Sequence, residues 1–130
     1  MKYAIDASGG MFIPELIDAM IRHVSKAGDA SGIVFFDHEI TNAVAGPAFT
    51  PDDVKGGGGT LIQPVFDWMR DNAPGERLVV LSDGCFETKD VDTHGVVASL
   101  VLVDRRPEDL EDMKRHARAC FPNVAMIDAA

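Results

Sequence analysis

The chain has 130 residues, of which 46% are hydrophobic and 25% are charged, and its formal net charge at pH 7 is −9. These values are typical of one globular domain, which we expect over residues 1–130, and the acidic balance argues against nucleic acid as a partner, because phosphate binding requires a basic face. No apolar run is long enough to span a bilayer, and the N-terminus lacks the pattern of a secretory signal. Cys85 and Cys120 lack the spacing of a zinc site or disulfide framework. We therefore expect a cytoplasmic protein with free thiols.

The first predicted elements are a strand and a helix. Residues Lys2–Asp6 form a short apolar run that is typical of a buried strand. The apolar residues that follow recur at helical spacing and are Phe12, Leu16, Ile17, Met20, Ile21 and Val24. Pro14 suits the first turn of this helix, and Gly28 is a stop signal after it.

A hairpin and a long loop come next. Residues 33–36 and 39–44 predict two strands that are joined by a turn at Asp37 and His38. Strands joined so tightly must run antiparallel. Residues 46–59 are rich in glycine and proline, which predicts a loop.

The second half of the chain alternates between helices and strands. We expect a helix that starts at Thr60, because Thr60 and Gln63 have the spacing of a capping box and Pro64 is early enough to be tolerated. The later predictions are a strand over 77–82, an irregular stretch with one short helical turn over 85–95, a strand over 96–103, a helix over 107–120 and a strand over 124–127.

This order of elements predicts an α/β, Rossmann-like fold. Strands that alternate with helices form a mostly parallel sheet with helices on both faces, and the hairpin adds one antiparallel pair at the edge. In such sheets ligands bind beyond the carboxyl ends of the strands. The segments that reach this edge are DASGG (6–10), GGGGT (56–60) and SDG (82–84). We therefore expect three distant segments to converge at one end of the sheet.

Small oxygen donors stand at each of these places. They are Asp6, Ser8, Thr60 and Asp83. Two carboxylates and two hydroxyls, completed by water, suit a hard cation such as Mg²⁺, or alternatively Mn²⁺ or Ca²⁺. The chain has no His or Cys set that would favour zinc. The sequence thus predicts a divalent-cation site.

At this point the chain resembles the von Willebrand factor A (vWA) domain, and more closely a group of bacterial and phage vWA-like proteins. The metal-ion-dependent adhesion site of that family has the pattern D-x-S-x-S, then a separated T and a separated D. The matching residues here are Asp6, Ser8, Thr60 and Asp83, and the order of elements matches along essentially the whole chain. The pattern departs from the family at Gly10, where the second serine is expected.

The resemblance implies a role for each matching residue. Ser8 and Thr60 would bind the ion directly, and Asp6 and Asp83 would lie near it, directly or through water. Water would take the place of the hydroxyl that is missing at Gly10, which weakens the site. One coordination position would remain for a carboxylate from a partner protein. The implied partner is a MoxR-type AAA+ ATPase or an acidic segment of its client.

Other interpretations of these residues remain open. Asp6 and Asp83 are also good turn residues, and Thr60 a good helix cap. Because of Gly10, a degenerate vWA module that binds a partner without metal is the main alternative. A metal-dependent hydrolase is a weaker one. With Asp6 as nucleophile, Ser8 stands where such phosphatases have a second Asp; Ser8 as an acyl nucleophile lacks a G-x-S-x-G frame and a His partner. We expect a protein without enzymatic activity.

Overall fold

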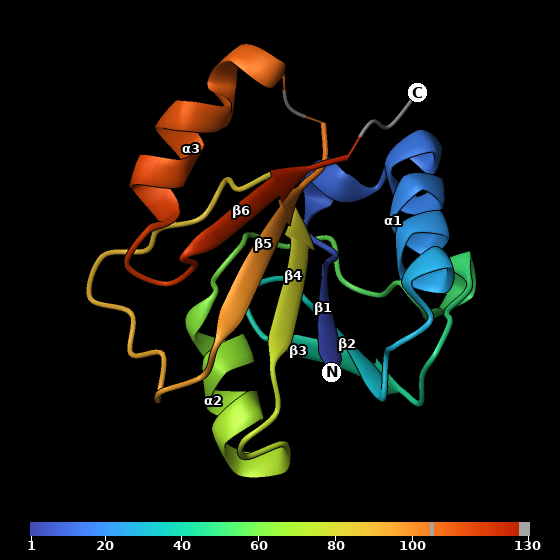
Figure 1. Ribbon diagram of the computed structural model, residues 1–130. Coiled ribbons are helices and arrows are strands. Elements are labelled where there is room, and N and C mark those ends of the chain that lie inside the picture. The colour runs from blue at the N-terminus through green and yellow to red at the C-terminus, as the bar shows by residue number, and fades with distance from the viewer. Residues whose placement is uncertain (105, 128–130) are drawn as a thin grey trace.

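The computed structural model describes residues 1–104 and 106–127. Its centre is a six-stranded sheet with the strand order β3-β2-β1-β4-β5-β6 (Figure 1). The strands are β1 (Lys2–Asp6), β2 (Gly32–Phe36), β3 (Ile40–Val44), β4 (Leu78–Ser82), β5 (Ala98–Leu102) and β6 (Asn123–Met126). Neighbouring strands are parallel except β2 and β3, which are antiparallel. The predicted α/β class, with one antiparallel edge pair, is confirmed.

Helices cover both faces of the sheet. The helices are α1 (Pro14–Ala27), α2 (Gln63–Asn72) and α3 (Leu110–Ala117), with short 3-10 turns η1 (Gly9–Met11), η2 (Pro51–Asp53) and η3 (Pro107–Asp109). The helix α1 packs on one face, where Met20 shares a core with Ile5. The helices α2 and α3 pack on the other, where Phe66 and Met113 share a core with Val80 (Figure 1). A covered parallel sheet is thus buried on both sides, which explains the continuous apolar strands.

Alternation along the strands assigns the polar residues at their ends to a face. Successive side chains of a strand point to opposite faces. Asp6 is two residues after Ala4 and therefore shares its face of the sheet, and Ser82 shares the face of Val80 in the same way. Both Ala4 and Val80 lie in the core under α2 and α3. Asp6 and Ser82 therefore end neighbouring strands on the same face.

The ends of α1 follow the sequence signals. Pro14 occupies the first turn, and the helix stops at Gly28, which has a left-handed conformation (φ 68°) and donates its N–H to the carbonyl of Val24. Phe12 lies before the helix and is 42% exposed, so the apolar stripe begins at Leu16 instead.

The predicted start of α2 at Thr60 is wrong. The helix begins at Gln63, and its N-cap is Ile62, with no side-chain cap. The side chain of Gln63 does not close a capping box, because it binds Asp67 and the main chain of Asp92 instead. Pro64 lies in the first turn, as predicted.

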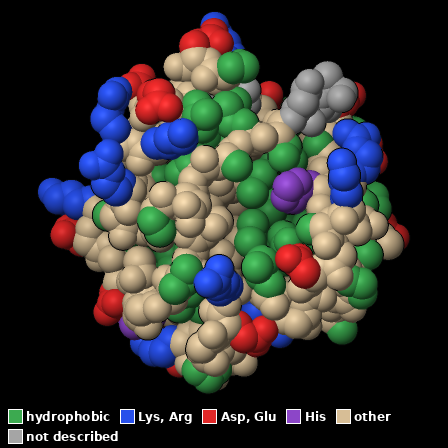
Figure 2. Space-filling model, in the orientation of Figure 1, with side chains coloured by type: hydrophobic (Ala, Val, Ile, Leu, Met, Phe, Trp, Pro, Cys, Tyr) green, Lys and Arg blue, Asp and Glu red, His purple; other side chains and the backbone are tan. Residues whose placement is uncertain are grey.

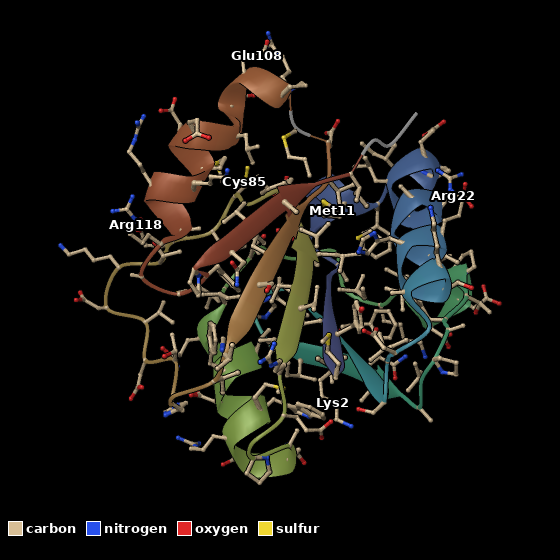
Figure 3. The ribbon with its side chains drawn as sticks, viewed as in Figure 1. Lys2, Met11, Arg22, Cys85, Glu108 and Arg118 are labelled. Atoms are coloured by element: carbon tan, nitrogen blue, oxygen red, sulfur yellow. The ribbon has the colours of Figure 1, made fainter. Side chains whose placement is uncertain are left out.

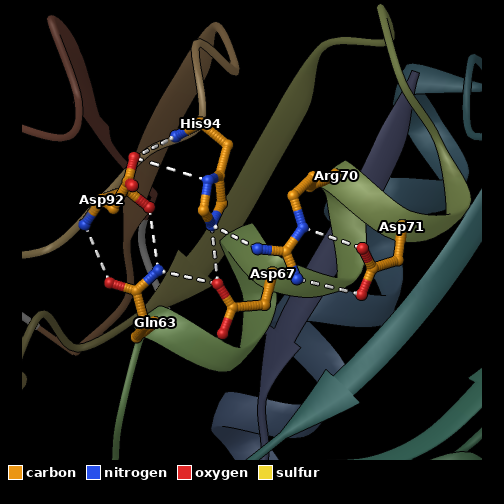
Figure 4. A network of polar contacts seen from close by, with 6 residues as sticks. All are labelled: Gln63, Asp67, Arg70, Asp71, Asp92 and His94. Carbon is orange, nitrogen blue, oxygen red and sulfur yellow. Dashed lines mark hydrogen bonds and ion pairs between the residues drawn. The ribbon is translucent and has the colours of Figure 1, made fainter.

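The segment between β4 and β5, residues 83–97, is irregular and contains no helix. The short helical turn expected in this segment is therefore wrong. A polar network ties this segment to α2 (Figure 4). His94 Nε2 lies 2.7 Å from Asp67 Oδ1, and the N–H of Asp92 donates to Gln63 Oε1 at 2.8 Å. We call this network the His94 clasp; its members are Gln63, Asp67, Arg70, Asp71, Asp92 and His94.

None of the helices in residues 1–104 and 106–127 combines the length and the apolar character that crossing a bilayer requires.

Candidate functional site

The centre of the candidate site is Asp6, at the carboxyl end of β1. Its side chain is fully buried. Ser82 donates its hydroxyl to Oδ2 at 2.5 Å, and the N–H of Ser8 donates to Oδ1 at 2.9 Å. Burial raises the pKa of Asp6 above its usual value, hydrogen bonds from Ser82 and Ser8 lower it, and the nearby charge of Asp83 raises it. The net direction is upward, so a buried carboxyl is held here at an electrostatic cost.

The turn after β4 brings Asp83 to the same place. The N–H of Gly84 donates to the Ser82 hydroxyl at 3.0 Å, and the N–H of Cys85 donates to Asp83 Oδ1 at 2.9 Å. Both bonds fix the turn as it leaves the strand. Figure 3 shows Cys85 and Met11 at the same end of the sheet, opposite Lys2. The segments that follow β1 and β4 therefore meet, as the sequence predicted.

The glycine loop is docked against the extension of β1 by main-chain hydrogen bonds. The N–H of Gly57 donates to the carbonyl of Ala7 at 2.8 Å, and the N–H of Gly9 donates to the carbonyl of Gly58 at 3.0 Å. Gly56 has a φ of 156°, and a Cβ there would lie 2.4 Å from the Ala7 carbonyl oxygen. Glycine is required at this position because the two backbones approach so closely.

Asp37 holds the other side of the glycine loop. Its buried carboxylate accepts the N–H groups of Glu39 and Gly58, each at 3.1 Å, and its carbonyl accepts the N–H of Leu61 at 2.9 Å. Burial raises the pKa of Asp37, but main-chain hydrogen bonds and the neighbouring His38 lower it more, and the net direction is downward. Gly58 and Leu61, which lie on either side of Thr60, are thereby held against the turn after β2.

The structure links the four predicted ligands to different degrees. Asp6 and Ser8 are joined by hydrogen bonds, and Asp83 acts on Asp6 through its charge. Thr60 reaches the same edge through the docked loop and is partly buried, and its hydroxyl forms no hydrogen bond with the described residues.

Gly10 lies in the exposed turn η1, where the resemblance calls for a serine. A Cβ built on Gly10 meets no atom within 4 Å. The absence of a hydroxyl at this position is therefore not imposed by crowding, and the surrounding chain has room for a serine.

The donor set consists of oxygen atoms. Within the described ranges, no three His, Cys, Asp or Glu side chains are grouped so that they could hold a metal ion. The candidate set contains two carboxylates, and the other protein donors are the hydroxyls of Ser8 and Thr60. Such a set suits a hard cation that keeps several waters, since oxygen ligands and retained water are what Mg²⁺ prefers.

Sequence reasoning missed the parts of Ser82 and Asp37. The sequence gives no local signal for a role of Ser82, and it predicts Asp37 only as a turn residue. The register pairs Ile5 with Leu81, so the next residues, Asp6 and Ser82, stand side by side. A predicted pairing of β1 with β4 would have revealed this contact. No local signal identifies the contact between Asp37 and Gly58, which are separated by 21 positions.

A scan of the chain against models of known protein families finds no match, and a search of curated proteins finds no similar sequence.

Proposed function

We propose that this protein is a vWA-type interaction module without enzymatic activity, which binds a divalent cation at this edge and uses it to hold a carboxylate of a partner protein. Ser8 and Thr60 would bind Mg²⁺ directly, and Asp6 and Asp83 would bind it directly or through water. The observation that carries the proposal is the buried Asp6 carboxyl beside the charge of Asp83, at an edge where two hydroxyls also arrive.

The electrostatics favour a cation at this place. A buried carboxylate next to a second carboxylate is destabilised in its charged form, and a divalent cation relieves both the burial and the repulsion. In the described part of the chain Asp6 is held by the hydroxyl and amide groups of Ser82 and Ser8 rather than by a basic side chain. A metal ion would supply the missing positive charge.

The resemblance also suggests the partner and the compartment. A MoxR-type AAA+ ATPase, or an acidic segment of its client, would present the carboxylate, and the complex would form in the cytoplasm. A pull-down from host extract, with and without chelator, tests this. Recovery of such an ATPase that is lost with chelator supports the assignment, and a chelator-insensitive partner contradicts the metal-held contact.

The metal is tested by thermal unfolding with added Mg²⁺ or Mn²⁺. A ligand present at about 100 times its Kd stabilises the folded state by about 2.7 kcal/mol, which raises the Tm by several degrees. We expect this rise in the natural protein and not in Asp6→Asn, which keeps the shape of the side chain. The matched control Asp52→Asn changes an exposed acid in η2 and should keep the full response.

Gly10→Ser separates this proposal from the metal-free alternative, which gains support because Ser82 and Ser8 already donate one hydrogen bond to each oxygen of Asp6. If the natural protein binds the ion and Gly10→Ser binds it more tightly, water fills the gap in a working site. If only the variant responds to metal, the natural module works without an ion and the proposal fails.

A further inference from the structure

A groove runs between α3 and the last strand, and none of the candidate metal ligands lines it. It has a volume of about 450 Å³, within the range of ligand-binding clefts. Its apolar lining includes Leu100, Phe121 and Val124, which come from β5, from the turn after α3 and from β6. The groove therefore joins a helix to the open edge of the sheet.

The charge of this groove is opposite to that of the protein. Its charged lining residues are Lys114 and Arg118, and no Asp or Glu of the described chain lines it, although the net charge is −9. The two cations are four positions apart and thus on one side of the helical turn. Lys114 also lies 3.4 Å from Glu111, whose side chain is 78% exposed. Figure 2 shows Lys and Arg side chains over α3 with Asp and Glu side chains beside them, and Figure 3 places Arg118 at the end of that helix from which the chain continues toward β6.

The outer edge of β6 offers main-chain groups that pair with no other described strand. β6 stands last in the strand order and pairs with β5 alone among the described strands. The N–H of Ile127 donates to the carbonyl of Leu102, so Ile127 faces β5. Because this direction alternates along a strand, the main-chain groups of Val124 and Met126 face away from the sheet. An exposed edge of this kind is a template for a further strand.

We propose that this edge binds an extended acidic segment of a partner protein as an additional strand beside β6. Its main chain pairs with Val124 and Met126, an acidic side chain reaches Lys114 and Arg118, and an apolar side chain packs into the groove. Strand addition of this kind obtains affinity from the main chain and specificity from side-chain pockets.

Two other occupants fit the groove less well. A small anion would use the two cations but not the main-chain groups of the edge. A second copy of this chain, paired edge to edge through β6, would bring the Lys114 and Arg118 pairs of both copies together, and like charges in contact oppose association. The acidic peptide uses all three features.

The probe is a phage-displayed library of random ten-residue peptides, selected on the natural protein. We expect the selected peptides to combine at least one Asp or Glu with alternating apolar residues. Titration of a synthetic peptide should show binding that is at least tenfold weaker with K114E/R118E. The matched control R22E/K26E makes the same charge change at the same spacing on α1 and should change binding less than twofold. Circular dichroism and Tm measurements confirm that both variants fold.

Two further measurements locate the contact. N-methylation of alternate peptide residues should abolish binding in one register, because it removes the donors that face β6. Amide exchange should slow at Val124 and Met126 when the peptide binds. Chelator should leave the peptide affinity unchanged, so this proposal and the metal proposal fail independently.

Several results would overturn the proposal. The first is a selection that yields no peptide sensitive to K114E/R118E, or equal losses of binding in both charge-reversed variants. The second is full binding by peptides that are N-methylated in either register. Competition by citrate alone at similar affinity would indicate a small-anion site, and self-association of the free protein through β6 would indicate a second copy as the occupant.

Discussion

The acidic residues Asp6 and Asp67 lie in two polar networks that shift the pKa of a carboxyl group in opposite directions. Asp6 is fully buried, and its pKa is raised, chiefly by burial. Asp67, in the His94 clasp, has a side chain that is 43% exposed, and its pKa is lowered, chiefly by the hydrogen bond from His94. The clasp provides basic partners for its acid, whereas hydroxyl and amide groups hold Asp6.

The difference separates a structural contact from a candidate binding site. A half-exposed acid with a basic neighbour is satisfied by the fold itself and contributes modestly to stability. A buried acid beside a second acid is left with an electrostatic cost that an added cation can remove.

The largest effect is expected from Ser82→Ala. This change removes the hydroxyl that donates to Asp6 and that accepts the N–H of Gly84, so two buried groups lose a partner. We expect the free energy of unfolding to fall by on the order of 3 kcal/mol, measured by urea denaturation. The matched control Ser99→Ala, at a partly exposed position of β5, should cost less than about 1 kcal/mol. Equal losses would contradict the role given to Ser82.

Gly56→Ala should break the docking of the glycine loop. The added Cβ would lie 2.4 Å from the Ala7 carbonyl oxygen, at a φ that alanine rarely adopts. We expect a loss of about 2 kcal/mol and a weaker response of the Tm to Mg²⁺, although no ligand is removed. Gly59→Ala is the control, since a Cβ there meets nothing within 4 Å. An unchanged metal response in Gly56→Ala would contradict the part of this loop in the site.

The dependence of stability on pH should differ in sign between the two acids. The folded-state pKa of Asp6 lies above its usual value of 3.8, so the folded state retains a proton and stability falls as pH rises through that folded-state pKa. The folded-state pKa of Asp67 lies below 3.8, so its contribution is present above that value and is lost as pH falls through the lowered pKa.

The measurement is denaturant unfolding in chelating buffer, from about pH 3 to pH 8. Relative to the natural protein, Asp6→Asn should gain stability toward neutral pH, and Asp67→Asn should lose it as the Asp67 carboxyl ionises. If the free energy of unfolding of both variants changed with pH in the same direction relative to the natural protein, the opposite pKa shifts of Asp6 and Asp67 would be contradicted.

The smallest effect is expected from His94→Ala. Its hydrogen bond to Asp67 is half exposed, so we expect a loss of about 0.5–1 kcal/mol. Hydrogen exchange should accelerate in residues 88–97, while Asp6 and its neighbours stay protected. The control Asp18→Asn, which loses an exposed pair with Arg22 on α1, should leave that segment unchanged. Acceleration at β1 as well would mean that the two networks are coupled.

The sequence was sufficient for the architecture because its signals are local. Pro14 and Gly28 delimit α1, and the apolar strand runs predict a sheet that is buried on both faces. The convergence of three segments followed from the topology alone, since the carboxyl ends of parallel strands lie at one edge.

The details of the site were not predictable in the same way, because distant partners determine them. Gln63 looked like half of a capping box, but Asp92, 29 positions away, binds its side chain. Ser82 stands 76 positions from Asp6, and its part depends on the register of β1 and β4. Local propensity contains no information about such contacts.

The place of β1 in the sheet has a consequence for synthesis of the chain. β1 precedes the other described strands in the chain and lies near the middle of the sheet, between β2 and β4. A growing chain can pair β1 with β2 early, but Asp6 meets Ser82 only after β4 has left the ribosome. A chain cut short before β4 lacks the partner of Asp6 Oδ2 and leaves one side of β1 unpaired, so a fragment exposes an acid and a strand edge that the finished molecule buries.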